Sequence, residues 1–194
     1  DVFDENRYFT KSASINPIEI QLKSGPVKIG ILICEDLWDE GYSTKVTQSL
    51  NNDGADIFIN ISASPFYLYK FRERLDIVKD KVNHFKKHFM YCNLVGAQDE
   101  LIYDGASFAI NPQGECIGQA GDFTDEILLI DTDNDSVIVP NYQSEEESIV
   151  DALSLGVSDY FSKTGHTKAI LGLSGGIDSA LTAAIACNAL GPKN

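Results

Sequence analysis

The chain has 194 residues, of which 43% are hydrophobic and 23% are charged, the balance of a globular protein that buries a core. Its formal net charge is −14, so its surface as a whole repels phosphate backbones, which excludes a general nucleic-acid binder. No apolar run approaches the ~20 residues of a membrane span, no secretory signal opens the sequence, and the four cysteines form no CxxC pair. We therefore expect a cytoplasmic protein with no membrane partner.

Short apolar runs rich in β-branched residues alternate with amphipathic stretches over most of the chain. In chain order, strands are expected at 27–33, 55–61, 90–95, 106–110, 115–119 and 126–130, and helices at 44–51 and 70–88. The residues Asn111-Pro112-Gln113-Gly114 are a hairpin signal between two of the strands. This order predicts an α/β layered fold with a mixed sheet. Cys92 lies in one of the strands and is expected in the core.

The pattern changes after residue 130. Residues 131–144 are polar and contain Pro140, and we interpret them as linking sequence. An amphipathic helix is expected at 145–163, with an acidic first turn and Gly165 as its C-cap. A strand at 168–173, a Ser-Gly-Gly turn and an Ala-rich helix at 177–190 follow, with Cys187 expected in the core. The chain should therefore divide into residues 1–135, a linker at 136–144, and the first part of a second α/β domain at 145–194.

The turn before the last helix carries the most specific motif, Leu173-Ser174-Gly175-Gly176-Ile177-Asp178-Ser179. Its two glycines let the backbone turn tightly, and the helix that follows points its positive end at the same place. Backbone N–H groups and serine hydroxyls in this arrangement suit a pyrophosphate group, and Asp178 could hold Mg²⁺ between phosphate oxygens. The Gly-Lys-Ser/Thr ending of a Walker loop is absent.

This motif resembles the PP-loop of the N-type ATP pyrophosphatases, which include NAD⁺, GMP and asparagine synthetases. The resemblance implies a Rossmann-like α/β domain that binds ATP and Mg²⁺ and adenylates an oxygen atom of its substrate before a nitrogen nucleophile attacks. The residues that it assigns to ATP are Gly172, Leu173, Ser174, Gly175, Gly176, Ile177, Asp178 and Ser179.

A second motif, Ile33-Cys34-Glu35-Asp36-Leu37-Trp38, follows a buried strand. A cysteine where the chain leaves a strand can face a cleft, and its thiolate can attack a carboxamide when a base removes its proton. The backbone N–H of Glu35 would then meet the developing oxyanion. A cysteine after a strand is on its own more often a core residue, so this motif needs its context.

That context resembles the nitrilase superfamily, and above all its glutaminase branch fused to NAD⁺ synthetase. The matching segments include Ala63-Ser64-Pro65, the stretch from Gln98 to Ser107 and the stretch from Val2 to Phe9. The resemblance implies the C-terminal part of a nitrilase-type α-β-β-α layered fold, followed by the PP-loop domain. The residues to which it gives roles are Cys34 as nucleophile, Glu35 beside it, and Ser64, Lys70 and Glu5 as ligands of glutamine.

The same resemblance implies that L-glutamine, ATP and deamido-NAD⁺ are the substrates and that the parent protein is a homo-oligomer. Ammonia released at Cys34 would amidate deamido-NAD⁺ after its adenylation. The general-base glutamate and the lysine of the family's triad fall before residue 1, and the rest of the synthetase domain falls after residue 194. We therefore expect this chain alone to be incomplete for both half-reactions.

Three other interpretations remain open at this point. A stand-alone nitrilase-type amidase or carbamoylase would explain the first 130 residues but not the SGGIDS motif. A PP-loop ligase for another acid, such as GMP synthetase, usually draws its ammonia from a different glutaminase fold. A non-catalytic scaffold is the third interpretation, because the upstream triad residues are not in the chain.

Overall fold

The computed structural model describes residues 7–133 and 136–194. A mixed sheet of six strands forms its centre, in the order β1-β2-β3-β4-β7-β8. Its bounds are β1 (Ile18–Leu22), β2 (Gly25–Ile33), β3 (Ile57–Ser62), β4 (Phe89–Asn93), β7 (Phe108–Ile110) and β8 (Cys116–Gln119). The strands β2, β3 and β4 are parallel, and the remaining pairs are antiparallel. The predicted mixed sheet and its late hairpin are confirmed.

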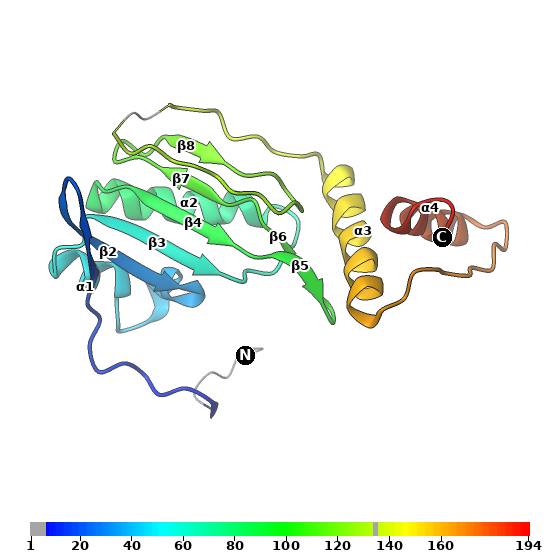
Figure 1. Cartoon of the computed structure of the whole chain (residues 1–194), viewed down its shortest axis with the longest axis horizontal. Helices are drawn as coiled ribbons and strands as arrows, with labels where there is room; N and C mark the ends of the chain where they lie inside the picture. The colour runs from blue at the N-terminus through cyan, green and yellow to red at the C-terminus, as the bar shows by residue number, and fades with distance from the viewer. Residues whose placement is uncertain (1–6, 134–135) are drawn as a thin grey trace.

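One face of this sheet is covered by helices, as Figure 1 shows for α2. The short helix α1 (Val46–Asn52) links β2 to β3, and α2 (Lys70–Phe85) links β3 to β4. The apolar residues of α2 recur every three or four positions, which places one stripe against the sheet. The core that results contains Phe71, Leu75, Val78 and Val82 of α2 against Phe58, Phe89, Tyr91 and Phe108 of the strands.

The opposite face of the sheet is largely open in the described residues. Ile33 is 66% exposed and Ile61 is 52% exposed, although both lie in strands. Cys92 is also exposed, so its predicted place in the core is wrong. The reason is the two-residue alternation of a strand, which turns Tyr91 and Asn93 toward α2 and Cys92 toward the open face. The described residues therefore supply one helix layer and one sheet of the four-layer arrangement that the resemblance implies.

A two-stranded hairpin, β5 (Val95–Gln98) with β6 (Leu101–Asp104), stands apart from the main sheet. The predicted strand at 90–95 is in fact divided, because β4 ends at Asn93 and β5 begins at Val95. The turn of the hairpin includes Asp99 with a left-handed φ of 51°. Each of its strands has four residues, too few to show a clear apolar alternation in the sequence.

The predicted strand at 126–130 is wrong. The segment has no strand partner, and Ile127 and Leu129 are both 90% exposed. Leu128 and Ile130 lie instead over Gly118 on the open face of the sheet. The linking residues that follow run beside β8, because Ile138 N–H donates to Cys116 O and the side-chain amide of Gln119 makes reciprocal bonds with the backbone of Asn141.

Two helices complete the described chain, α3 (Glu145–Thr164) and α4 (Ile177–Leu190), close to the predicted bounds. A reciprocal capping box of Ser144 and Glu147 begins α3, and Gly165 ends it with a φ of 74°. Figure 1 shows α3 against the end of the β5–β6 hairpin and α4 beyond it. None of the helices in the described ranges combines the length and apolarity that a bilayer crossing requires.

The predicted strand at 168–173 is also wrong, and Ile170 is fully exposed. A strand needs a neighbouring strand to satisfy its backbone groups, and within the described residues this segment makes a backbone bond to Asn194 O through Ala169 N–H but pairs with no strand. Cys187 was predicted to be in the core and is exposed on α4, a helix with no buried residue.

Candidate active site

Cys34 lies where β2 ends and a 3₁₀-helical turn, Cys34–Leu37, begins. Its φ is 46°, a left-handed conformation that costs free energy for a residue with a Cβ atom and that is concentrated at functional sites. Two hydrogen bonds that involve side chains hold this turn: Ile33 N–H donates to Asp36 Oδ2 over 2.9 Å, and Asn60 Nδ2 donates to Cys34 O over 3.4 Å. The partly buried thiol therefore projects from a rigid corner at the carboxyl end of a parallel strand.

The residues that follow Cys34 carry charge and an aromatic ring close to it. The exposed carboxylate of Glu35 accepts a hydrogen bond of 3.1 Å from the Tyr42 hydroxyl. Trp38 lies four residues after Cys34, and the ammonium of Lys70 lies over its ring, 3.9 Å from the ring centroid. A cation over an indole face is held by the ring quadrupole. The fold thus brings Lys70, the first residue of α2, to the segment that contains Cys34.

Lys70 is bound on several sides. Its Nζ lies 3.2 Å from the Tyr67 hydroxyl and 3.6 Å from Glu73 Oε2. Burial lowers the pKa of Lys70, while the nearby carboxylates of Glu73 and Glu35 act in the opposite direction. Burial and a hydrogen bond to Glu73 raise the pKa of Tyr67 to about 12, so its hydroxyl stays protonated and donates to that carboxylate. Lys70 therefore sits partly desolvated in a position where it could bind an anion.

Ser64 is buried, and its backbone is held by Asn93 at the end of β4. Ser64 N–H donates to Asn93 Oδ1 over 2.9 Å, and Asn93 Nδ2 donates to Asp104 Oδ1 over 3.1 Å. Asp104, at the end of β6, also accepts from both terminal nitrogens of Arg74 on α2, one of them at 2.8 Å. Arg74 is 0% exposed and Asp104 3%, so the pair lies in the interior.

Arg74 is not among the residues predicted from the sequence. A signal was available, because this arginine lies within the apolar stripe of the α2 helix, directly before Leu75, where a charged residue would be buried. Its partner could not be read from sequence, because Asp104 is 30 residues away and in another element.

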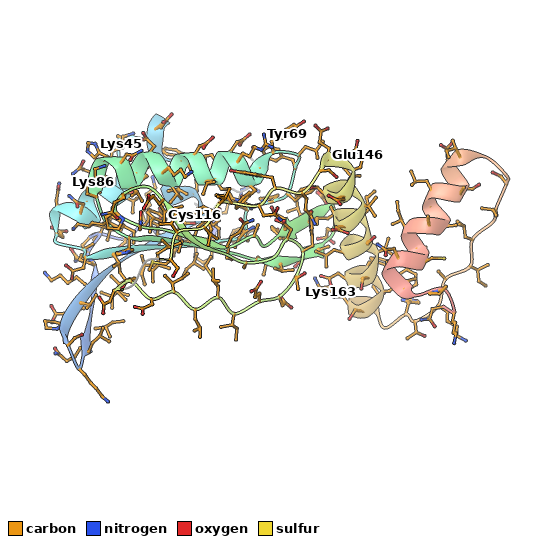
Figure 2. All side chains as sticks on the ribbon, turned by 90° about the horizontal axis from the view of Figure 1, so that it is seen from above. Lys45, Tyr69, Lys86, Cys116, Glu146 and Lys163 are labelled. Atoms are coloured by element: carbon orange, nitrogen blue, oxygen red, sulfur yellow. The ribbon has the colours of Figure 1, made fainter. Side chains whose placement is uncertain are left out.

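A cavity of about 410 Å³ adjoins Lys70. It lies between the loop that precedes α2, the segment around Phe123 and the start of α3. Tyr69 and Glu146, which are among its lining residues, are labelled in Figure 2. The acidic residues Asp104 and Asp122 line it. Burial, and then the carboxylate of Asp104, raise the pKa of Asp122 to about 6, while Arg74 acts in the opposite direction.

This shift predicts that Asp122 weakens folding at neutral pH. Because its folded pKa lies above its ordinary value, its favourable contribution is complete below about pH 4 and is lost as pH rises through about 6. Asp122→Asn should therefore raise the unfolding free energy by about 1–2 kcal/mol at pH 8, after allowance for solvent screening, and by much less at pH 4. Chemical unfolding at both pH values measures this. The exposed neighbour Asp125→Asn is the control, and a gain from Asp122→Asn that does not change with pH would contradict the prediction.

The SGGIDS motif forms a loop at the start of α4. Gly175 has a left-handed φ of 87°, and Gly176 is the N-cap with no side-chain cap. The hydroxyls of Ser174 and Ser179 lie 3.0 Å apart, and Ser179 Oγ also accepts from Ser174 N–H over 3.2 Å. The uncapped first turn of α4 therefore presents free N–H groups next to two hydroxyls, which suits a phosphate. Asp178 is exposed in the same turn, within reach of a cation that such a phosphate would bring.

The remaining predicted residues are distributed as follows. Gly172 and Leu173 lie in the exposed segment before the loop, and Ile177 begins α4. Glu5 lies outside the described residues. Within the described ranges no group of three or more histidine, cysteine and acidic side chains is placed to hold a metal by itself. The Cys34 segment, Ser64 and Lys70 thus share one end of the sheet, and the SGGIDS loop lies on the far side of α3 (Figure 1).

Two family models match the chain. Residues 1–139 match carbon-nitrogen hydrolase, and residues 149–194 match NAD synthase. The solved structure of a carbon-nitrogen hydrolase from Helicobacter pylori covers 62% of the chain and 44% of its own length, with a TM-score of 0.52 at 23% identity. At that identity the likeness shows the fold alone, and it confirms the nitrilase-type layering of the first part.

Relatives that match the whole chain carry both parts. The glutamine-dependent NAD⁺ synthetase of Synechocystis is 40% identical over 100% of the chain and 36% of its own length, and that of Thermotoga maritima is 34% identical over 100% and 39%. The structure of glutamine-dependent NAD⁺ synthetase from Acinetobacter baumannii in complex with ADP superposes with a TM-score of 0.83 at 34% identity, over 100% of the chain and 36% of that structure.

The chain spans little more than a third of the length of these relatives. Its second match excludes a stand-alone amidase, since such a protein has no NAD synthase segment. The chain belongs to the carbon–nitrogen hydrolase family, and it continues into the start of an NAD synthase domain as the glutamine-dependent NAD⁺ synthetases do.

Proposed function

We propose that the whole protein makes NAD⁺ from deamido-NAD⁺, ATP and glutamine, and that Cys34 is the nucleophile of its glutaminase half. The observation that carries this proposal is the left-handed corner at Cys34, followed four residues later by Trp38, whose ring contacts the ammonium of Lys70. The relatives that match along the whole chain are named glutamine-dependent NAD⁺ synthetases. None of these relatives supports the alternative of a GMP synthetase.

The chemistry at Cys34 would be acyl transfer. The thiolate attacks the carboxamide carbon of glutamine, the carbonyl π electrons move to oxygen, and the backbone N–H of Glu35 stabilises that oxyanion. Collapse of the intermediate breaks the C–N bond, and ammonia leaves with a proton from the general acid. Water then hydrolyses the γ-glutamyl thioester to glutamate and frees the thiol. The acid–base pair of this reaction is assigned by family resemblance to residues before this chain.

Ser64 and Lys70, together with Glu5, would bind the α-amino and α-carboxylate groups of glutamine. The support for Lys70 is its partly desolvated ammonium, which contacts the ring of Trp38. Trp38 lies four residues after Cys34 in the sequence. The support for Ser64 is its fixed position in the buried network of Asn93 and Asp104. An ammonium held without bulk water favours a carboxylate over a neutral group.

Lys70→Met in the whole protein should raise the KM for glutamine by about 30-fold or more, since a lost charge pair with a bound ligand costs roughly 2–5 kcal/mol. The KM for ATP and the rate with ammonium should stay unchanged. Steady-state kinetics with each nitrogen source measure both effects. The control is Lys79→Met, a half-buried lysine of the same helix. An unchanged KM for glutamine would leave Lys70 as a structural residue of α2.

The second active site would begin at the SGGIDS loop. Free N–H groups at the start of α4 and the hydroxyls of Ser174 and Ser179 would hold the ATP phosphates, and Asp178 would hold Mg²⁺ against them. The relative from Acinetobacter baumannii was solved with ADP. Gly172, Leu173, Gly175, Gly176 and Ile177 would shape this cradle. The adenylated deamido-NAD⁺ would then be attacked by the ammonia that the first site releases.

The proposed division places the glutaminase part at 1–135, the linker at 136–144 and the synthetase part from 145 onward. We further propose a cytoplasmic homo-oligomer that uses no nucleic acid or membrane partner. The function as a whole is tested by giving the complete protein either glutamine or ammonium. Both should support NAD⁺ synthesis, and only the first should depend on Cys34.

A further inference from the structure

The β5–β6 hairpin connects the synthetase part to the glutaminase site, and its stability needs a physical explanation. An isolated two-stranded hairpin is marginally stable in water. This one has no partner in the main sheet. What holds it must therefore be groups that bind it from outside. Arg74 of α2 and Asn93 bind Asp104 at the end of β6, and further contacts come from α3 on one side and from the loop after β3 on the other.

Two side chains of α3, those of Asp159 and Lys163, bind the backbone of the hairpin at Ala97. Ala97 N–H donates to Asp159 Oδ2 over 2.7 Å, and Lys163 Nζ donates to Ala97 O. The two side chains lie one helical turn apart and bind each other at 3.0 Å. Figure 2 shows Lys163 at the end of α3 away from Glu146. Both backbone groups of one residue are thus satisfied by one charged pair, which resembles the pairing that a third strand would offer.

Two glycines allow this close contact. A Cβ atom on Gly96 would lie 3.0 Å from Asp159 Oδ2, and the φ of Gly96 is +138°, a conformation that other residues rarely adopt. On the helix side, a Cβ atom on Gly156 would lie 3.3 Å from Ile102 Cδ1. Burial acts to raise the pKa of Asp159, but the bond from Ala97 and the ammonium of Lys163 outweigh it, so its pKa is lowered.

The hairpin in turn holds the loop that leads to Lys70. Ile102 O accepts a hydrogen bond of 2.7 Å from Phe66 N–H, two residues after Ser64. The last residue of β6, Asp104, reaches Ser64 a second time through Asn93. The loop continues to Tyr69, whose φ of 71° sets the entry into α2 at Lys70. A displacement of the hairpin would therefore displace Ser64 and the start of α2 together.

We propose that Asp159, supported by Lys163, is a positioning residue for the glutamine subsite, acting from the synthetase part through Ala97 and the β5–β6 hairpin. This inference rests on the proposed function. This gives α3 a specific role. The helix begins the synthetase part, but it binds the hairpin that keeps Ser64 and Lys70 of the glutaminase part in position. Small displacements of a binding group are expensive, since about 1 Å can cost as much as a hundredfold in rate.

The test uses the complete protein with Asp159→Leu, which removes the acceptor for Ala97 N–H. The KM for glutamine should rise by about tenfold or more, while synthesis from ammonium keeps its rate. Asp159→Asn retains an oxygen for Ala97 N–H and should restore a value close to the wild type. The matched control is Ser162→Leu, an exposed position of the same helix.

Hydrogen exchange separates this inference from the proposed function. In Asp159→Leu the amides of Ala97 and Phe66 should exchange faster, while those of β3 stay protected. Unchanged exchange at Phe66 would overturn the inference, whatever the kinetics show. An equal loss of the glutamine and ammonium reactions would also overturn it, because α3 would then serve the synthetase part alone. If the wild-type protein releases no ammonia from glutamine, the proposed function fails, and the exchange data still decide whether Asp159 positions the loop.

Discussion

Replacing Cys34 with alanine in the complete protein is expected to abolish NAD⁺ synthesis from glutamine and to leave synthesis from ammonium at its wild-type rate. The loss should be about 10⁴-fold or more, since removal of a covalent nucleophile eliminates the route rather than slowing one step of it. The geometry supports this expectation because the thiol projects from a rigid, left-handed corner that two backbone-anchored bonds maintain. The alanine variant lacks the thiol but keeps both hydrogen bonds, because neither of them involves the Cys34 side chain.

The measurement is the rate of NAD⁺ formation with each nitrogen source, together with ammonia release from glutamine. Cys92→Ala is the matched control, because that cysteine lies in β4, which β3 separates from β2, and outside the proposed site. Loss of both reactions in a folded Cys34→Ala protein would count against the division of labour between the two halves. Retention of the glutamine reaction would remove Cys34 from the role of nucleophile.

Arg74→Met should lower the free energy of unfolding by about 3–5 kcal/mol, the typical cost of leaving one partner of a buried ion pair without the other. Asp104, which is 3% exposed, would lose its cationic partner and would keep, among the described residues, Asn93 as its side-chain donor. The same loss should loosen the Ser64 backbone, which Asn93 holds from the other side. We therefore expect Arg74→Met both to lower the free energy of unfolding and to disturb the position of Ser64 in the glutamine subsite.

Chemical unfolding of Arg74→Met, Asp104→Leu and the double variant measures this coupling. The double variant should cost clearly less than the sum of the two single ones, because it leaves no unpaired buried charge. Arg72→Met, an exposed arginine two residues earlier, should change stability by no more than about 0.5 kcal/mol. Additive costs in the cycle would show that the pair contributes packing rather than charge pairing.

The sequence by itself determined the parts whose signals are local. Apolar periodicity located α2 and α3, Ala-rich composition located α4, and the Asn-Pro-Gln-Gly turn located the β7–β8 hairpin. The order strand, cysteine, turn placed Cys34 at the end of β2, and the glycines of SGGIDS placed a tight turn before α4. Each of these features depends on neighbours within a few residues, which is why the chain order alone reveals it. The roles that the resemblance gave to these residues stay predictions until the variants are measured.

Only the tertiary structure decided which residues meet. It brought Lys70 onto Trp38, joined Arg74 to Asp104 and formed the β5–β6 hairpin from two strands of four residues each. The predicted strands at 126–130 and 168–173 do not form, and Cys92 and Cys187 are exposed. Strand pairing and burial are properties of two segments, not of one. An apolar run becomes a strand only where a second backbone satisfies its N–H and C=O groups, and a side chain is buried only where another element covers its face.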